Sequence, residues 1–236
     1  MHKLEMPEWA HDFVLQRRGK LHVYEDLDPR KTALVVVDLQ NGFMDEAVAV
    51  AYVPTAVEIV PNVNRLAAAV RRTGGKVFWI RNTFDQTNVT AWSEYFDILT
   101  PERRAAALAN MAPNSRGHQI YPTLEVKPED EIVNKYRFSA FIQGASDLPA
   151  RLRAQGYDTV LITGTVTNVC CESSARDAMM MNFKTVMVSD GNAARTDAEH
   201  NATLASFYSV FGDVMDTDFL ISRLEANAAA RAAAAA

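Results

Sequence analysis

The chain has 236 residues, of which 48% are hydrophobic and 22% charged, and this suits one globular domain with a full core, with two small domains as an alternative. The net charge of −5 and the lack of a lysine- or arginine-rich run exclude nucleic acid and anionic membrane surfaces as expected partners. No apolar stretch is long enough to span a membrane, and the N-terminal segment lacks the apolar core of a signal peptide.

The two cysteines, Cys170 and Cys171, are neighbours in the sequence. Adjacent cysteines make a poor structural disulfide, and the chain offers no other partner for either of them. Both thiols are therefore expected to be reduced, as in a cytoplasmic protein.

Three regions are expected along the chain. Residues 1–30 mix aromatic and charged side chains without a clear period, which indicates an N-terminal arm lying on the body of the protein or on a second subunit. Residues 31–225 form the predicted domain. The Ala-rich tail, residues 226–236, has high helix propensity but no evident packing partner, so it is expected to fray.

Strand and helix patterns alternate through the domain. Residues 32–37 (TALVVV) are an uninterrupted apolar run, typical of a central parallel strand that is covered on both faces. Further strands are predicted at 76–81, 131–134, 159–163, 184–189 and 213–215, and helices at 61–73, 101–111, 147–155, 172–181, 197–211 and from 217 onward. Gly164 is predicted to end the fourth strand.

This alternation predicts a three-layer α/β/α sandwich with a mainly parallel sheet of about six strands. In such sheets the ligand site lies beyond the carboxyl ends of the strands. Residues 82–122 have an irregular pattern with several aromatic side chains, and an insertion of this length between strands is expected to shape a pocket or an interface.

Three chemically useful residues follow predicted strands at that edge: Asp38, Lys135 and Cys170. A carboxylate can accept the thiol proton, an ammonium can stabilise negative charge, and a thiolate can attack a carbonyl carbon. Cys170 falls near the first turn of a helix, where free N–H groups and the helix dipole are predicted to lower the pKa of its thiol. Each residue also has a structural explanation: Asp38 could be a turn or cap residue, Lys135 a solvated charge, and the cysteines buried apolar residues. Three accidental placements at the same edge of the sheet are less expected than a catalytic site.

The segments DLQNGF (38–43), KYRFSAF (135–141) and GTVTNVCCESSARDA (164–178) together resemble the isochorismatase-like cysteine hydrolases, over nearly the whole stretch from Thr32 to about Phe219. The resemblance implies that Asp38, Lys135 and Cys170 form a catalytic triad with Cys170 as the nucleophile. It also implies a cis peptide between Thr165 and Val166, with the N–H groups of Val166 and Cys170 forming an oxyanion hole.

The motif variants indicate what the site acts on. The stretch 81–85 (RNTFD) lacks the histidine of the metal-binding members, so no metal or other cofactor is expected, and the cysteine favours C–N bond cleavage. The segments are most similar to the ureidoacrylate and N-carbamoyl amidohydrolases, so a small carbamoyl or ureido compound is the expected substrate and a covalent thioester-type intermediate the expected route. A hydrolase of plain amides (maleamate-type) and a non-catalytic binding protein of the same fold are the alternatives. The family also implies a homo-oligomer.

Eight residues near the three motifs are candidates for binding the substrate. For the aromatic ones ordinary core packing is an equal alternative, and Arg137 suits either a substrate carboxylate or a surface charge. The candidates are Asn41, Asn82, Trp92, Tyr136, Arg137, Phe138, Phe141 and Asn168.

Overall fold

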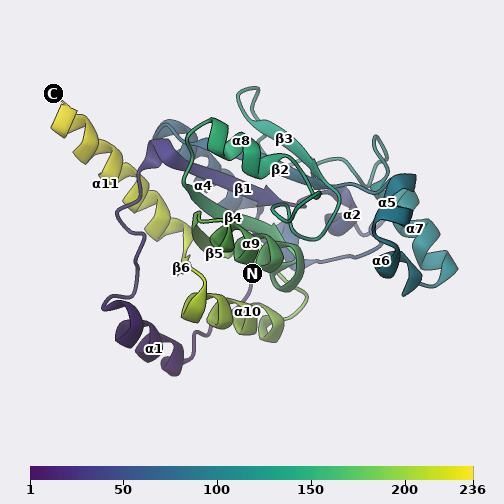
Figure 1. Ribbon diagram of the computed structural model, residues 1–236, viewed down its shortest axis with the longest axis horizontal. Helices are drawn as coiled ribbons and strands as arrows, with labels where there is room; N and C mark the ends of the chain where they lie inside the picture. The colour runs from purple at the N-terminus through teal and green to yellow at the C-terminus, as the bar shows by residue number, and fades with distance from the viewer. Residues whose placement is uncertain (236) are drawn as a thin grey trace.

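The computed structural model describes residues 1–235, and at its centre lies a six-stranded sheet whose neighbouring strands all run parallel (Figure 1). The strand order is β3-β2-β1-β4-β5-β6, so the chain winds outward from β1 in both directions. The strands are β1 (Thr32–Val37), β2 (Lys76–Asn82), β3 (Glu131–Lys135), β4 (Thr159–Thr165), β5 (Lys184–Ala193) and β6 (Asp213–Met215). The predicted fold class is confirmed.

Helices cover both faces of the sheet, which makes the three layers (Figure 1). α4 and α11 cover one face, and α8, α9 and α10 cover the other, where α1 packs on the outside of α10. The α-helices are α1 (Glu8–Arg18), α2 (Asn41–Met44), α3 (Thr55–Glu58), α4 (Val60–Arg72), α5 (Gln86–Ala91), α6 (Ser93–Asp97), α7 (Pro101–Met111), α8 (Leu148–Ala154), α9 (Glu172–Met180), α10 (Asp197–Val210) and α11 (Thr217–Ala235). A 3₁₀ turn (Pro29–Lys31) precedes β1, and a π-helical turn (Thr167–Cys171) precedes α9.

The central strands are buried because both faces meet apolar layers. All six residues of β1 are buried: Leu34 and Val36 face one core, whereas Val35 and Val37 face the other. A continuous run of this kind is stable here because each side chain, whichever way it points, is removed from water.

Local signals explain why several helices begin where the sequence predicts. A proline lies in the first turn of α4 and of α7, where its missing N–H is not needed. Thr100 caps α7 by accepting a hydrogen bond from the N–H of Arg103. At α10, Thr196 and Glu199 form a reciprocal capping box.

The fourth strand differs from its prediction, because Gly164 does not end it. β4 runs on to Thr165, and the register against β5 shifts between Ile162 and Gly164. Gly164 has a φ of 122°, and a side chain there would collide with the backbone of Val37. The glycine is thus needed for close approach of β1 and β4 rather than for a break.

The insertion between β2 and β3 is more regular than its sequence suggests. It contains α5, α6 and α7, which project together beyond one end of the sheet (Figure 1). Asp85 begins α5 with a capping box that includes Asn88.

The two terminal segments lie on the body of the protein. Ala10 and Val14 of α1 are buried, and the guanidinium of Arg18 donates to the carbonyls of Tyr208 (2.7 Å) and Gly212 (2.9 Å) at the end of α10. The tail that was expected to fray is helical as far as Ala235, and the amide of Asn227 donates to backbone carbonyls that precede β1; Ala236 lies outside the described residues. Within residues 1–235 no helix combines the length and apolarity needed to cross a membrane.

Candidate active site

The carboxyl ends of β1, β3 and β4 bring Asp38, Lys135 and Cys170 together. Asp38 directly follows β1, Lys135 ends β3, and Cys170 lies in the π-helical turn after β4. Asp38 has a φ of 54°, a left-handed conformation that aspartate tolerates better than most residues, and its N–H donates to the carbonyl of Ile80 (3.0 Å). The backbone itself therefore turns Asp38 off the strand.

Lys135 is the centre of this group. Its Nζ lies 2.8 Å from Asp38 Oδ2 and 3.6 Å from Cys170 Sγ, and it donates to Asn82 Oδ1 (3.2 Å) and to the carbonyl of Arg137 (3.0 Å). The side chains of Asp38 and Lys135 are fully buried, and Cys170 is 4% exposed. The three groups that the sequence selected thus form one compact, nearly dry cluster.

The thiol of Cys170 is protonated at neutral pH, contrary to the prediction from the helix dipole. Burial raises its pKa to about 12, and the charge of Lys135 offsets only part of that effect. The dipole argument is wrong here because desolvation of the thiolate outweighs the partial charge at a helix end. A thiol in this state can act as a nucleophile only where a base removes its proton.

Asp38 is placed to be that base. Burial raises the pKa of its carboxyl group above the usual value, whereas Lys135 and the Cys170 thiol both lower it. Within residues 1–235 neither carboxylate oxygen makes a hydrogen bond of normal geometry, and the ion pair with Lys135 is its close polar contact. A desolvated carboxylate that lies within hydrogen-bonding reach of a thiol is a competent proton acceptor.

Burial alone would lower the pKa of Lys135. The negative charge of Asp38 and the hydrogen bonds to Asp38 and Cys170 outweigh burial, so the pKa is raised and the side chain stays an ammonium. Lys135 therefore supplies a fixed positive charge rather than a titrating group.

The turn before Cys170 offers two further donors. The Thr165–Val166 peptide is cis, as the resemblance implied. Among the described residues, the N–H of Val166 donates no hydrogen bond to the backbone, and the N–H of Cys170 belongs to the π-helical turn that follows it. Backbone N–H groups in such a place are the kind of donor that a developing oxyanion requires.

Gln40 is a positioning residue that the sequence analysis missed. Its amide accepts from the N–H of Asn82 (2.7 Å) and donates to the carbonyls of Asn82 (3.1 Å) and His118 (2.9 Å). Gln40 thereby ties the end of β1 to the end of β2 and to His118, which lies in the segment between β2 and β3. Asn82, a predicted substrate ligand, uses its side-chain oxygen on Lys135, so it orients the ammonium.

An aromatic wall, consisting of Trp92, Tyr95 and Phe138, lies beside the cluster. Trp92 stacks on Tyr95 with ring centroids 4.5 Å apart, and Phe138 meets both rings edge-on at 4.8 and 5.4 Å. Burial raises the pKa of Tyr95, and its phenol lies within electrostatic reach of Cys170 and Lys135. Tyr95 is not among the predicted substrate ligands, and the aromatic pattern of residues 82–122 is its signal in the sequence.

Arg137 does not point into the site as a free cation. Its guanidinium donates to the carbonyls of Tyr136 (2.7 Å) and Ala91 (2.7 Å) and lies 5.3 Å from the ring centroid of Trp92. Because its own carbonyl accepts from Lys135 Nζ, Arg137 connects the insertion to the catalytic lysine. The guanidinium is thus engaged by backbone carbonyls and an aromatic ring, which argues against the capture of a substrate carboxylate.

The other predicted ligands occupy different surroundings. Asn41 donates to the carbonyl of Arg116 (3.0 Å), and Phe141 packs in the core against Phe183. Tyr136 lies beside Arg81 on the edge of the sheet. Asn168 lies in the turn that carries Cys170, and its buried side-chain oxygen has no hydrogen-bond partner within residues 1–235. Of these four, the structure brings only Asn168 to the nucleophile's turn.

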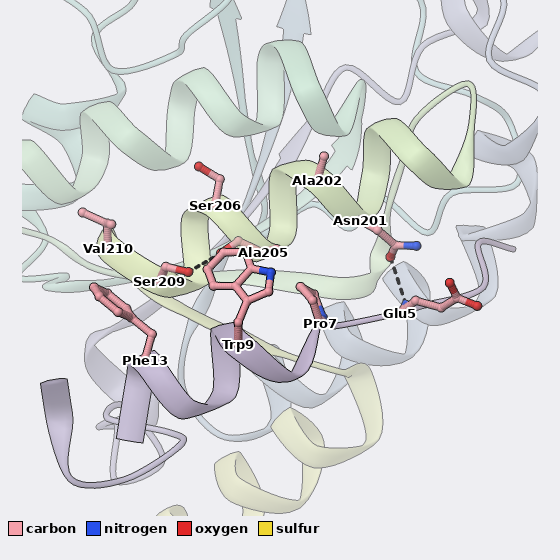
Figure 2. Close-up of a pocket in the computed structure, with 10 residues that line it drawn as sticks. All are labelled: Glu5, Pro7, Trp9, Phe13, Asn201, Ala202, Ala205, Ser206, Ser209 and Val210. Atoms are coloured by element: carbon pink, nitrogen blue, oxygen red, sulfur yellow. Dashed lines mark hydrogen bonds between the residues drawn. The ribbon is translucent and has the colours of Figure 1, made fainter. Parts of the chain in front are cut away.

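A groove elsewhere on the surface has an apolar lining but none of the catalytic side chains. It lies between α1 and α10, encloses about 640 Å³, and includes Trp9, Phe13 and Val210 in its walls (Figure 2). In the part of the chain that the structure describes, no cluster of three or more His, Cys, Asp or Glu side chains is arranged to hold a metal ion.

Comparison with known proteins agrees with this architecture. The isochorismatase domain family model matches residues 32–219. A ureidoacrylate amidohydrolase, RutB, from Methylobacterium radiotolerans is 31% identical over 205 residues, which cover 80% of this chain and 78% of that protein. The crystal structure of a cysteine hydrolase from Pseudomonas syringae pv. phaseolicola is similar with a TM-score of 0.76 and 28% identity, covering 86% of this chain and 96% of the other. The N-carbamoylsarcosine amidase of Thermoplasma acidophilum gives a TM-score of 0.64 and 26% identity, covering 80% and 97%. This chain belongs to the isochorismatase family and is a hydrolase of that family.

Proposed function

We propose that this protein is a cysteine-dependent amidohydrolase that cleaves a C–N bond of a small carbamoyl or ureido compound. The observation that carries the proposal is the buried contact of Lys135 Nζ with both Asp38 (2.8 Å) and Cys170 (3.6 Å). A protein that only binds a ligand gains nothing from this costly burial of a base, a cation and a thiol together. The relatives named for ureidoacrylate and N-carbamoylsarcosine support the carbamoyl class.

The first half of the reaction makes a covalent intermediate. Asp38 takes the proton of the Cys170 thiol while Sγ bonds to the substrate carbonyl carbon. The carbonyl oxygen becomes an oxyanion that accepts from the N–H groups of Val166 and Cys170, each such donor contributing about 3 kcal/mol to transition-state stabilisation. The C–N bond then breaks, and Asp38 returns its proton to the departing nitrogen.

The second half restores the enzyme. Asp38, again a carboxylate, takes a proton from water as the water oxygen attacks the acyl or carbamoyl carbon. The C–S bond breaks, and the sulfur recovers the proton from Asp38. Throughout, Lys135 keeps its charge and holds Asp38 in place.

Ammonia release tests this function directly, since a ureido compound yields ammonia either at once or when carbamic acid decomposes. The panel contains ureido acids, simple amides including maleamate, and nicotinamide. The variants are Cys170→Ala and Cys171→Ala; Cys171 is the matched control because it is the neighbouring thiol, equally buried.

We expect turnover of a carbamoyl or ureido substrate, a loss of more than about a thousandfold in Cys170→Ala, and near wild-type rates in Cys171→Ala. Preference for maleamate would move the proposal to the plain-amide alternative. Turnover that survives in Cys170→Ala would refute the cysteine mechanism.

A further inference from the structure

Helix α10 holds the turn that carries Cys170 from both sides. On the N-terminal side, Thr167 Oγ1 lies 3.0 Å from His200 Nδ1. On the C-terminal side, the hydroxyl of Thr203 donates to Glu172 Oε2 (3.0 Å). Thr203 lies three positions after His200, so one face of α10 supplies both contacts, one on each side of Cys170.

His200 is a buried titratable residue that the proposed reaction does not use. Burial lowers its pKa to about 4, with a further contribution from His2, so the ring is neutral near pH 7. Its Nε2 is buried and makes no hydrogen bond of normal geometry within residues 1–235, although the backbone of Ser189 lies near it. Thr167 is therefore its side-chain partner among the described residues. An apolar residue would fill such a place at lower cost in desolvation, so the contact with Thr167 needs a reason.

The N-terminal segment supports His200 from behind. The ring of His2 stacks on that of His200, with centroids 4.4 Å apart and planes at 20°. His2 Nε2 accepts from the N–H of Ala194 (2.9 Å), which places the ring proton on Nδ1, 2.7 Å from Asp197 Oδ1. The side chain of His2 is 3% exposed, so the ring is fixed in position.

We propose that His200, backed by His2, is a positioning residue for the nucleophile: through Thr167 it fixes the π-helical turn that directs Cys170 Sγ at the substrate carbonyl. The inference rests on the proposed role of Cys170. Reaction rates depend steeply on the position of the attacking atom, and a displacement of about 1 Å can cost about a hundredfold. The N-terminal segment thereby contributes to the site without touching the substrate.

The test compares Thr167→Val, Thr167→Ser, His200→Leu and His2→Ala. Two experiments are done on each variant. Steady-state kinetics give kcat and KM for the hydrolysed substrate. Mass spectrometry of the Cys170 peptide gives the second-order rate constant of alkylation by iodoacetamide. The matched control is Thr185→Val, which removes another buried threonine hydroxyl, bonded to the carbonyl of Phe183 (3.1 Å) and remote from the turn.

Thr167→Val and His200→Leu are expected to lower both kcat and alkylation about 10- to 100-fold with little change in KM, because the nucleophile rather than the binding surface is displaced. His2→Ala is expected to lose less, and Thr167→Ser, which keeps the hydroxyl, to recover most of the rate. Thr185→Val is expected to match the wild type.

Wild-type kcat and alkylation in a folded Thr167→Val would overturn the inference, as would an equal loss in Thr185→Val. Thr167→Val keeps the side-chain volume and decides the matter if His200→Leu does not fold. The two proposals fail separately: turnover in Cys170→Ala refutes the cysteine mechanism, whereas alkylation still reports whether His200 holds the turn.

Discussion

The strand-end side of the site and the insertion side are built on different principles. Asp38, Lys135 and Cys170 come from three parallel strands, and backbone geometry and burial hold them. The aromatic wall comes mostly from short helices of the insertion, and side-chain stacking and the guanidinium of Arg137 hold it. The difference teaches that the sheet fixes the geometry of the three strand-end residues, whereas the aromatic wall lies in a part of the chain that the sheet does not constrain.

Breaking the strand-end side should have the largest effect. Lys135→Met leaves Asp38 buried without its counter-ion, which we expect to cost about 3–5 kcal/mol of unfolding free energy and to abolish turnover. The double variant Asp38→Asn/Lys135→Met removes both charges and should regain much of the stability without any activity. Denaturant unfolding and ammonia release measure the two effects.

Lys76→Met is the control, because Lys76 lies at the other end of the sheet in a loose pair with Glu131 (3.8 Å). It should leave both stability and turnover nearly unchanged. An active Lys135→Met would show that the ammonium is dispensable and would remove the basis of the comparison.

The pH dependence of kcat/KM should report the burial of Asp38. The carboxyl group acts as a base only when it is deprotonated, and burial raises its pKa above the usual value of about 4. Activity should therefore be full above that raised pKa and fall about tenfold per unit as the pH drops below it. A pH–rate profile with an acid limb at or below pH 4 would contradict the assignment of Asp38 as the base.

Loosening the insertion should have a smaller effect than breaking the triad. Arg137→Met removes the donors to Ala91 and Tyr136 and the contact with Trp92, so we expect KM to rise about tenfold with a lesser change in kcat. Arg153→Met is the control: its guanidinium also lies 5.3 Å from an aromatic centroid, that of Phe183, and donates to a backbone carbonyl, but away from the site. Equal kinetics in both variants would show that Arg137 has no role in the site.

Removing one hydroxyl from the aromatic wall should have the smallest effect. Tyr95→Phe keeps the stacking on Trp92 and loses only a phenol hydroxyl that lies within electrostatic reach of Cys170 and Lys135, so a loss of about 1 kcal/mol, or roughly fivefold in kcat/KM, is expected. Tyr157→Phe, at a partly buried tyrosine that meets Phe78 edge-on, should have no kinetic effect. If kcat/KM is unchanged in Tyr95→Phe, the hydroxyl of Tyr95 has no kinetic role and the residue contributes only packing.

That Asp38, Lys135 and Cys170 come together could be predicted from the sequence because each lies at the end of a recognisable strand or in the turn after it. Parallel strands end at a common edge, so placing Asp38, Lys135 and Cys170 required only the strand pattern and the family motifs. The predicted substrate ligands transferred less well: Phe141 packs in the core and Arg137 is engaged by backbone carbonyls. Sequence spacing does not say which way a loop residue points, because packing decides it.

The sequence by itself determined the layers, the parallel sheet and the three strand-end residues, since hydrophobic periodicity and turn residues act locally. Only the tertiary structure decided the protonation of Cys170, because its pKa depends on burial by segments distant in sequence. The tertiary structure also decided the surroundings of Tyr95 and Gln40 and the stacking of His2 on His200. These contacts join residues up to 198 positions apart in the chain, and no local sequence pattern encodes them.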